Sequence, residues 1–233
     1  MAKSGSHRSI LNKIKLRLRY KLVGPAPFKN SAEYWEKRYR EGGNSGAGSY
    51  NRLAEFKAEV VNDFVNKNNV RSVVELGVGD GAQLRLAKYP LYIGFDVSES
   101  VVAKTRTLFA QDSSVQILHI SELTDRTKAD LSLSLDVIYH LVEDNVFDLY
   151  MEQLFDVSTK FVIIYASNSD SDWPDPHVRH RKFTRWVEQR RPDYKLVDTI
   201  RNRYPHSDID PDNTSFSDFY IFAKSDQQYS RDI

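Results

Sequence analysis

The sequence contains no cysteine, which excludes disulfide bonds and zinc–thiolate sites. It has no apolar run long enough to span a bilayer, and no segment that resembles a secretory signal. A chain without cysteine fits a reducing compartment. We therefore expect a cytoplasmic protein.

Charge is nearly balanced, with a formal net charge of +1, but it is unevenly placed. Residues 1–22 contain seven Lys and Arg residues and no acid, so the rest of the chain is mildly acidic. A mildly acidic body argues against a broad nucleic-acid-binding face. The basic segment favours an amphipathic arm that contacts an anionic membrane surface or an acidic partner, or packs on its own domain or on a second subunit of a homodimer.

Strand and helix patterns alternate along most of the chain. We divide it into a basic N-terminal arm and lid region (1–48), a main domain (49–225) and a tail (226–233). The expected helices cover 31–43, 49–66, 99–111, 145–158 and 182–191, with a further one that begins at 82 and ends at Pro90. The expected strands cover 71–77, 91–98, 115–121, the first part of 129–141, 160–168, 194–204 and 215–224. This order predicts an α/β fold with an open, seven-stranded, mostly parallel sheet and helices on both faces.

A glycine-rich loop, "ELGVGDG" (75–81), follows the first expected strand. In an open α/β sheet, ligands bind beyond the carboxyl ends of the strands. Gly77 and Gly79 would let the backbone approach a ligand, and Gly81 would let the next helix start close to the sheet. Asp96 ends the second strand, where an acid can accept hydrogen bonds from both hydroxyls of a ribose.

The acids of this loop indicate which ligand it binds. Glu75 and Asp80 would repel the pyrophosphate of a dinucleotide, whereas they favour a ligand that carries an ammonium and a sulfonium group. The sequence therefore predicts S-adenosylmethionine as cofactor.

Three stretches resemble motifs of the class I S-adenosylmethionine-dependent methyltransferases, which have a Rossmann-like fold. "VVELGVGDG" and "YIGFDVS" are similar to their first two motifs, and "ADLSLSLDVIYHLVED" to the fourth. The resemblance covers about residues 54–168, and Ser121 or Glu122 stands where the family often has an acid near adenine. It implies that the cofactor is bound by Glu75, Gly77, Gly79, Asp80, Gly81, Asp96, Val97, Ser98, Ser121 and Asp136.

The acceptor of the methyl group is less directly encoded. Methyltransferases that act on nucleobase amines resemble one another in an Asn/Asp-Pro-Pro-aromatic motif after the fourth strand. This chain has "LDVIYHL" there, without a proline, which argues against a nucleobase amine as acceptor. His140 is the candidate general base, because imidazole accepts a proton near neutral pH. The alternative is that His140 only caps or packs the following helix.

A metal site is a second hypothesis for the same edge of the sheet. Asp136, Asn168 and Asp170 follow the fourth and fifth strands, and their oxygen atoms could hold Mg²⁺ beside an acceptor hydroxyl. Ordinary loop capping by these residues is the alternative.

Aromatic and basic side chains are concentrated in two segments, one before the main domain and one within it. The segment 171–183 is rich in Trp, His and Arg, which suit sugars, and the aromatic helix near residue 35 together with the loop 44–50 could form a lid. The residues expected to bind substrate are Tyr34, Trp35, Tyr139, Asn168, His177, Arg179 and His180.

Together these features predict an O-methyltransferase that acts on a hydroxyl of a sugar or glycan. The stretches "SGAGSYNRLAEFKAEVVNDFV", "SLDVIYHLVED" and "HVRHRKFTRWV" also resemble, more loosely, a bacterial subgroup of O-methyltransferases from polysaccharide pathways, such as the mycobacterial methylmannose polysaccharide 1-O-methyltransferase. Three alternatives stay open: a methyltransferase for a small-molecule amine or carboxylate, a non-catalytic cofactor-binding protein that docks through its basic arm, and, in third place, a nucleic-acid methyltransferase.

Overall fold

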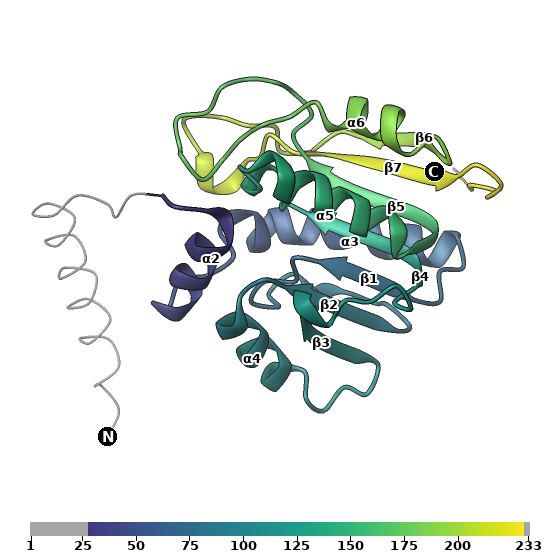
Figure 1. Ribbon diagram of the computed structural model, residues 1–233, viewed down its shortest axis with the longest axis horizontal. Coiled ribbons are helices and arrows are strands. Elements are labelled where there is room, and N and C mark those ends of the chain that lie inside the picture. The colour runs from purple at the N-terminus through teal and green to yellow at the C-terminus, as the bar shows by residue number, and fades with distance from the viewer. Residues whose placement is uncertain (1–27, 231–233) are drawn as a thin grey trace, which may run out of the picture.

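The computed structural model describes residues 28–230, so the basic arm (1–22) and the last three residues of the tail lie outside the described part. Within it, the strands form one seven-stranded sheet in the order β3-β2-β1-β4-β5-β7-β6 (Figure 1). β7 is antiparallel to both of its neighbours, and the pairs from β3 to β5 are parallel. The strands are β1 (Val73–Leu76), β2 (Tyr92–Asp96), β3 (Val115–His119), β4 (Ala129–Leu135), β5 (Ser158–Ala166), β6 (Tyr194–Ile200) and β7 (Asp218–Lys224). The predicted Rossmann-like α/β fold is confirmed.

The helices agree with the sequence pattern in most places. They are α2 (Ser31–Arg40), α3 (Asn51–Lys67), α4 (Glu99–Leu108), α5 (Asp144–Asp156) and α6 (Phe183–Arg190). The helix expected from residue 82 is wrong, because only a 3₁₀ turn forms at Leu84–Leu86. The chain becomes extended at Ala87, whose ψ is 146°, and the residue before Pro90 is biased away from helical conformation. Ser49 does not cap α3; it ends a separate 3₁₀ turn, Ala47–Ser49.

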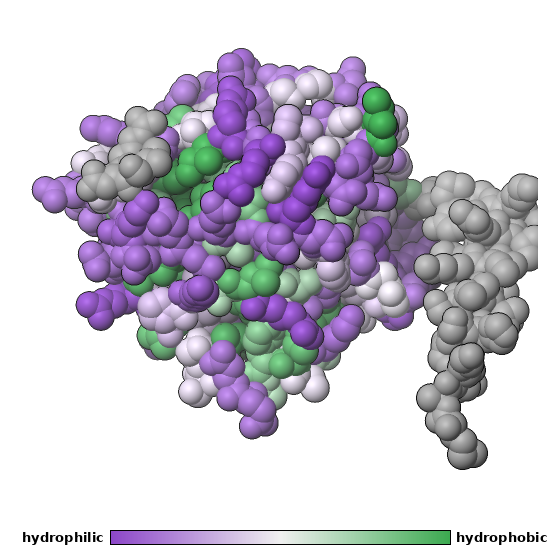
Figure 2. Space-filling view, turned by 180° about the vertical axis from the view of Figure 1, so that it is seen from behind, coloured by the Kyte–Doolittle hydropathy of each residue, from purple (hydrophilic) through white to green (hydrophobic). Residues whose placement is uncertain are grey.

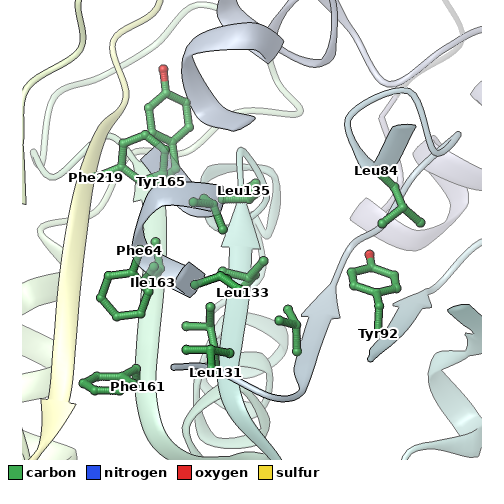
Figure 3. Packing of buried hydrophobic residues seen from close by; sticks show 14 of the residues in the cluster. Phe64, Leu84, Tyr92, Leu131, Leu133, Leu135, Phe161, Ile163, Tyr165 and Phe219 are labelled. Carbon is green, nitrogen blue, oxygen red and sulfur yellow. The ribbon is translucent and has the colours of Figure 1, made fainter. Parts of the chain in front are cut away.

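The core consists of two hydrophobic clusters, one on each face of the sheet. Leu131, Leu133 and Leu135 point to one side of β4, beside Phe161, Ile163 and Tyr165 of β5 (Figure 3). Helices α3 and α4 close this side, while α5 and α6 close the other side over the alternate residues of β5. This alternation follows from the two-residue period of a strand, so β5 buries side chains on both faces, as its apolar sequence predicted.

The strand order reverses between β1 and β4, which are neighbours although β2 and β3 separate them in sequence. At such a point the connections leave in opposite directions, and a crevice opens beyond the carboxyl ends of the strands. Figure 1 shows α2 beside this edge of the sheet. The fold therefore brings the N-terminal lid region, the glycine loop and the turn after β4 together.

The face opposite to that of Figure 1 is largely hydrophilic, with hydrophobic residues in small groups (Figure 2). No helix within residues 28–230 is long and apolar enough to cross a membrane.

Gly81 supports a close contact between the glycine loop and α4, which is a different role from the helix start expected for it. Its φ is +75°, and a Cβ there would lie 2.8 Å from Phe109 Cε2 and 3.0 Å from Thr105 Cγ2. We expect Gly81→Ala to destabilise the protein by about 2–3 kcal/mol, from backbone strain and overpacking together. Gly46 also has a positive φ, +90°, but open space surrounds it. Gly46→Ala should therefore show the effect of backbone strain without overpacking, a loss of stability of about 1 kcal/mol. Chemical unfolding measures both, and equal losses would contradict the packing role.

Candidate active site

A cavity of about 360 Å³ lies at the carboxyl ends of β1, β2 and β4. Its volume is in the range of pockets for small molecules and cofactors, about 300–1,000 Å³. The glycine loop, the turn after β4, helix α5 and the N-terminal lid region all contribute to its wall. Val97, Val146 and Leu149 line it and are each at least a third exposed, so they mark its opening to solvent.

The glycine loop is fixed to the end of β2 by Asp96. Gly77 and Gly79 both have positive φ and line the cavity. The N–H of Gly79 donates to Asp96 Oδ2 at 2.9 Å, and that of Ser98 donates to Oδ1 at 3.0 Å. A carboxylate has about four acceptor positions, so Asp96 keeps capacity for ligand hydroxyls. Burial raises the pKa of Asp96 above its ordinary value.

Glu75 contributes a second carboxyl group to the cavity. It is buried, and Tyr92 OH donates to its Oε2 at 2.6 Å. Burial raises the pKa of Glu75 to about 7, although the hydrogen bond from Tyr92 and the charge of Lys57 act in the opposite direction. A ligand cation would find an acid here that ionises in the physiological range.

Asp80 and Ser98, both expected to bind cofactor, hold the lid instead and lie outside the lining of the cavity. The Ser45 N–H and Tyr50 OH donate to Asp80 Oδ2 at 3.0 and 2.6 Å. Burial favours the neutral form of Asp80, yet these hydrogen bonds keep its pKa below its ordinary value. Ser98 caps α4 and donates to Glu36 Oε2 at 2.7 Å.

The lid region is the segment from α2 to Tyr50, and both ends of α2 are tied to the main domain. Glu36 bonds Ser98 and also accepts from the N–H of Ser100 at 3.2 Å. At the other end, Ser31 donates its backbone N–H and its hydroxyl to Glu143 at 2.9 and 2.6 Å. Trp35 lines the cavity from this helix, as the lid hypothesis requires.

His140 follows β4 in a 3₁₀ turn and lines the cavity. Its Nδ1 lies 3.1 Å from the carbonyl oxygen of His177. Because a carbonyl only accepts, the proton sits on Nδ1, which leaves the lone pair on Nε2. Burial lowers the pKa of His140 to about 4, so the ring is neutral at physiological pH.

Aromatic rings surround His140. Trp35 contacts it edge-on at 4.9 Å between centroids, and His177 stacks parallel to it at 5.5 Å. His177 in turn stacks on Tyr34 at 4.4 Å, which joins α2 to the segment 171–183. Tyr139 packs against His140 and donates its hydroxyl to Asp136 Oδ1.

Asp136 is engaged by protein groups, and this does not fit the proposed Mg²⁺ site. Lys57 Nζ lies 2.7 Å from its Oδ2, and Ser217 donates to Oδ1 at 2.9 Å. Asn168 accepts from the N–H of Thr184 in α6, and Asp170 accepts from that of Lys182, so both cap loops. Residues 28–230 contain no cluster of three or more His, Asp or Glu that could hold a metal ion.

Of the seven expected substrate residues only Trp35 lines the cavity, and the other six do not: Tyr34, Tyr139, Asn168, His177, Arg179 and His180. Asn168 accepts a hydrogen bond from the N–H of Thr184 at the start of α6. Arg179 is exposed and forms an ion pair with Asp144 at 3.0 Å. His180 is buried, and its Nδ1 bonds Ser167 Oγ at 2.5 Å. Ser121, in contrast, lines the cavity as expected near an adenine position.

Lys57 and Gln83 line the cavity and were not predicted from the sequence. Lys57 interrupts the apolar face of α3, four residues after Leu53 and four before Val61. A lysine within an apolar stripe is a signal that could have identified it. Gln83 follows the glycine loop directly, where we expected an ordinary helix.

No family model matches the sequence, and no curated protein matches it either. Many solved structures match the fold. The N-methyltransferase NodS from Bradyrhizobium japonicum, in complex with S-adenosylhomocysteine, has a TM-score of 0.66 and 14% identity over 85% of this chain and 100% of its own. Magnesium protoporphyrin IX methyltransferase from Synechocystis, with bound S-adenosylmethionine, has a TM-score of 0.55 and 16% identity over 92% and 97%. The small RNA methyltransferase HEN1 has a TM-score of 0.57 and 17% identity over 78% and 27%.

The fold is therefore that of the S-adenosylmethionine-dependent methyltransferases. At these identities the likeness concerns the fold, and the three neighbours differ in their acceptors.

The raised pKa of Glu75 predicts pH-dependent binding of a cationic ligand. The ligand's ammonium favours the ionised carboxyl, so affinity for S-adenosylhomocysteine should fall as pH decreases below about 7. Glu75→Gln should weaken binding at pH 8 by about tenfold and flatten this dependence. Isothermal titration calorimetry from pH 5.5 to 8.5 measures both.

The thermal stability of Glu75→Gln is the control, because it shows whether weaker binding results from a loss of folding. Because the pKa of Glu75 rises from 4.5 to about 7 on folding, the wild-type protein loses stability as pH increases through that interval. Glu75→Gln should thus melt no lower than wild type at pH 8. A wild-type affinity that is constant across pH 7 would contradict the assignment of Glu75.

Proposed function

We propose that the protein is an S-adenosylmethionine-dependent methyltransferase that methylates a hydroxyl group of a sugar or glycan. One observation carries the proposal: the glycine loop, Asp96 and a neutral histidine line the same cavity in a methyltransferase fold.

The chemistry of the cavity fits this cofactor. Asp96 is placed to hold the ribose hydroxyls, and Glu75 offers negative charge to an ammonium or sulfonium group. Apolar side chains near the opening, with Ser121 beside them, suit a purine ring. Gly77 and Val137 line the same wall of the cavity and lie close together, since a Cβ at Gly77 would lie 2.5 Å from Val137 Cγ2. A larger residue than glycine would not fit there.

When bound, the cofactor supplies a methyl group on a positively charged sulfur: the bond from the acceptor oxygen to the methyl carbon forms as the carbon–sulfur bond breaks, and the electron pair of that bond stays on sulfur. His140 accepts the hydroxyl proton at Nε2, while its Nδ1–H stays bonded to the His177 carbonyl. The low pKa of His140 means that this proton leaves readily to solvent and the ring returns to its neutral form.

Support for a sugar acceptor comes from Trp35, which lines the cavity beside His140. Aromatic rings pack against the apolar faces of sugars. An amine or carboxylate acceptor would need no base at His140, and this distinguishes the two classes of acceptor.

The cofactor assignment is tested by titration with S-adenosylmethionine, S-adenosylhomocysteine and NADH. We expect the first two to bind and NADH not to bind. Asp96→Ala should weaken binding of both by about tenfold or more, through loss of charge-assisted hydrogen bonds. Binding of NADH alone would indicate redox chemistry, and binding without turnover on any acceptor would favour a non-catalytic protein.

The role of His140 is tested by turnover at saturating cofactor, with a panel of glycan acceptors. His140→Ala should lower kcat by about 10²–10⁴-fold and leave the affinity for S-adenosylhomocysteine nearly unchanged. In the wild type, kcat should fall only as pH decreases through about 4, because protonation of His140 removes the lone pair. An unchanged kcat in the variant would exclude His140 as the base and favour an amine or carboxylate acceptor.

A further inference from the structure

Gln83 lines the cavity and has an unpaired acceptor atom. The residue is only 9% exposed, and its Nε2 donates to the Ala54 carbonyl at 3.1 Å. Its Oε1 is buried and has no hydrogen-bond partner among residues 28–230. Leaving a buried acceptor without a donor is unfavourable, so such an atom beside a cavity indicates a ligand donor.

Lys57 presents a cation to the same cavity. Its side chain is 1% exposed, and Nζ bonds Asp136 Oδ2 while it lies 5.4 Å from the ring centre of Tyr165. An ammonium has three donors, and within the described residues one of them is used in this ion pair. Gly48 of the lid packs closely on this ion pair, since a Cβ at that position would lie 2.7 Å from Asp136 Oδ2.

Glu75 completes a group of opposite charges. It lines the cavity together with Lys57 and Gln83, and the charge of Lys57 acts on its pKa. A simple anion would be repelled by Glu75 and Asp136, and a simple cation by Lys57. A ligand with both charges on adjacent groups satisfies all of these side chains, and an α-amino acid is such a ligand.

We propose that Lys57 and Gln83 recognise the amino-acid end of the cofactor. Lys57 donates to the α-carboxylate, and the α-ammonium donates to Gln83 Oε1 and to Glu75. This inference rests on the proposed function, because it assigns a part of the same cofactor. It makes the two residues determinants of selectivity for the complete cofactor over forms that lack the amino-acid part.

The test compares S-adenosylhomocysteine with 5′-methylthioadenosine, which lacks the amino-acid part, by calorimetry on the full chain. Wild type should prefer S-adenosylhomocysteine. Gln83→Leu should reduce that preference by about tenfold and leave the affinity for methylthioadenosine unchanged. Gln116→Leu, the same change at an exposed position on β3, should leave both affinities unchanged.

Lys57 is tested in a background that avoids an unpaired buried charge. The double variant Lys57→Met with Asp136→Asn removes both charges of the pair and should lose the preference for S-adenosylhomocysteine, whereas Gln116→Leu should retain it. Thermal melting verifies that each variant is folded.

The possible outcomes separate the two proposals. If wild type binds neither ligand, the proposed function fails, and this inference fails with it. If wild type binds both ligands and the ratio of affinities is the same in the Gln83 and Lys57 variants, the proposed function stands and the inference is overturned.

Discussion

The buried ion pair between Lys57 and Asp136 joins the parts of the molecule that form the cavity. Lys57 belongs to α3, and Asp136 ends β4 with a φ of +60°. Ser217, before β7, and Tyr139, beside the candidate base, both donate to the same carboxylate. Breaking a buried pair by removing one partner costs about 3–5 kcal/mol, so this contact constrains α3, β4 and the turn that carries His140 at once.

Acidic side chains have two separate tasks around the glycine loop. Glu75 and Asp96 face the cavity, where burial raises the pKa of each carboxyl. Asp80 and Glu36 are turned to the lid region and its contacts, and hydrogen bonds lower their pKa values. One short loop thus supplies both the electrostatics of the cavity and the attachment of the segment that covers it. The position of the lid region and the shape of the cavity therefore depend on the same part of the chain.

The wall of the cavity near His140 includes Trp35 of α2. Tyr34 of α2 stacks on His177 of the segment between β5 and α6, which joins these two parts of the chain. The solved neighbours share the sheet and differ in what they methylate. Acceptor choice in this fold thus depends on loops and lids carried by a common sheet, which is why the fold alone does not define the substrate.

The sequence by itself determined the strands, most helices, the glycine loop and the ends of β2 and β4, because these follow from local periodicity and from backbone conformations that only certain residues adopt. It also placed His140 at the correct edge of the sheet. Tertiary structure alone decided that Asp80 faces the lid, that Arg179 and His180 lie outside the cavity and that Lys57 is buried beside Asp136. The direction of a side chain in a loop, and the partner of a charge 79 residues away, depend on long-range packing that no local pattern records.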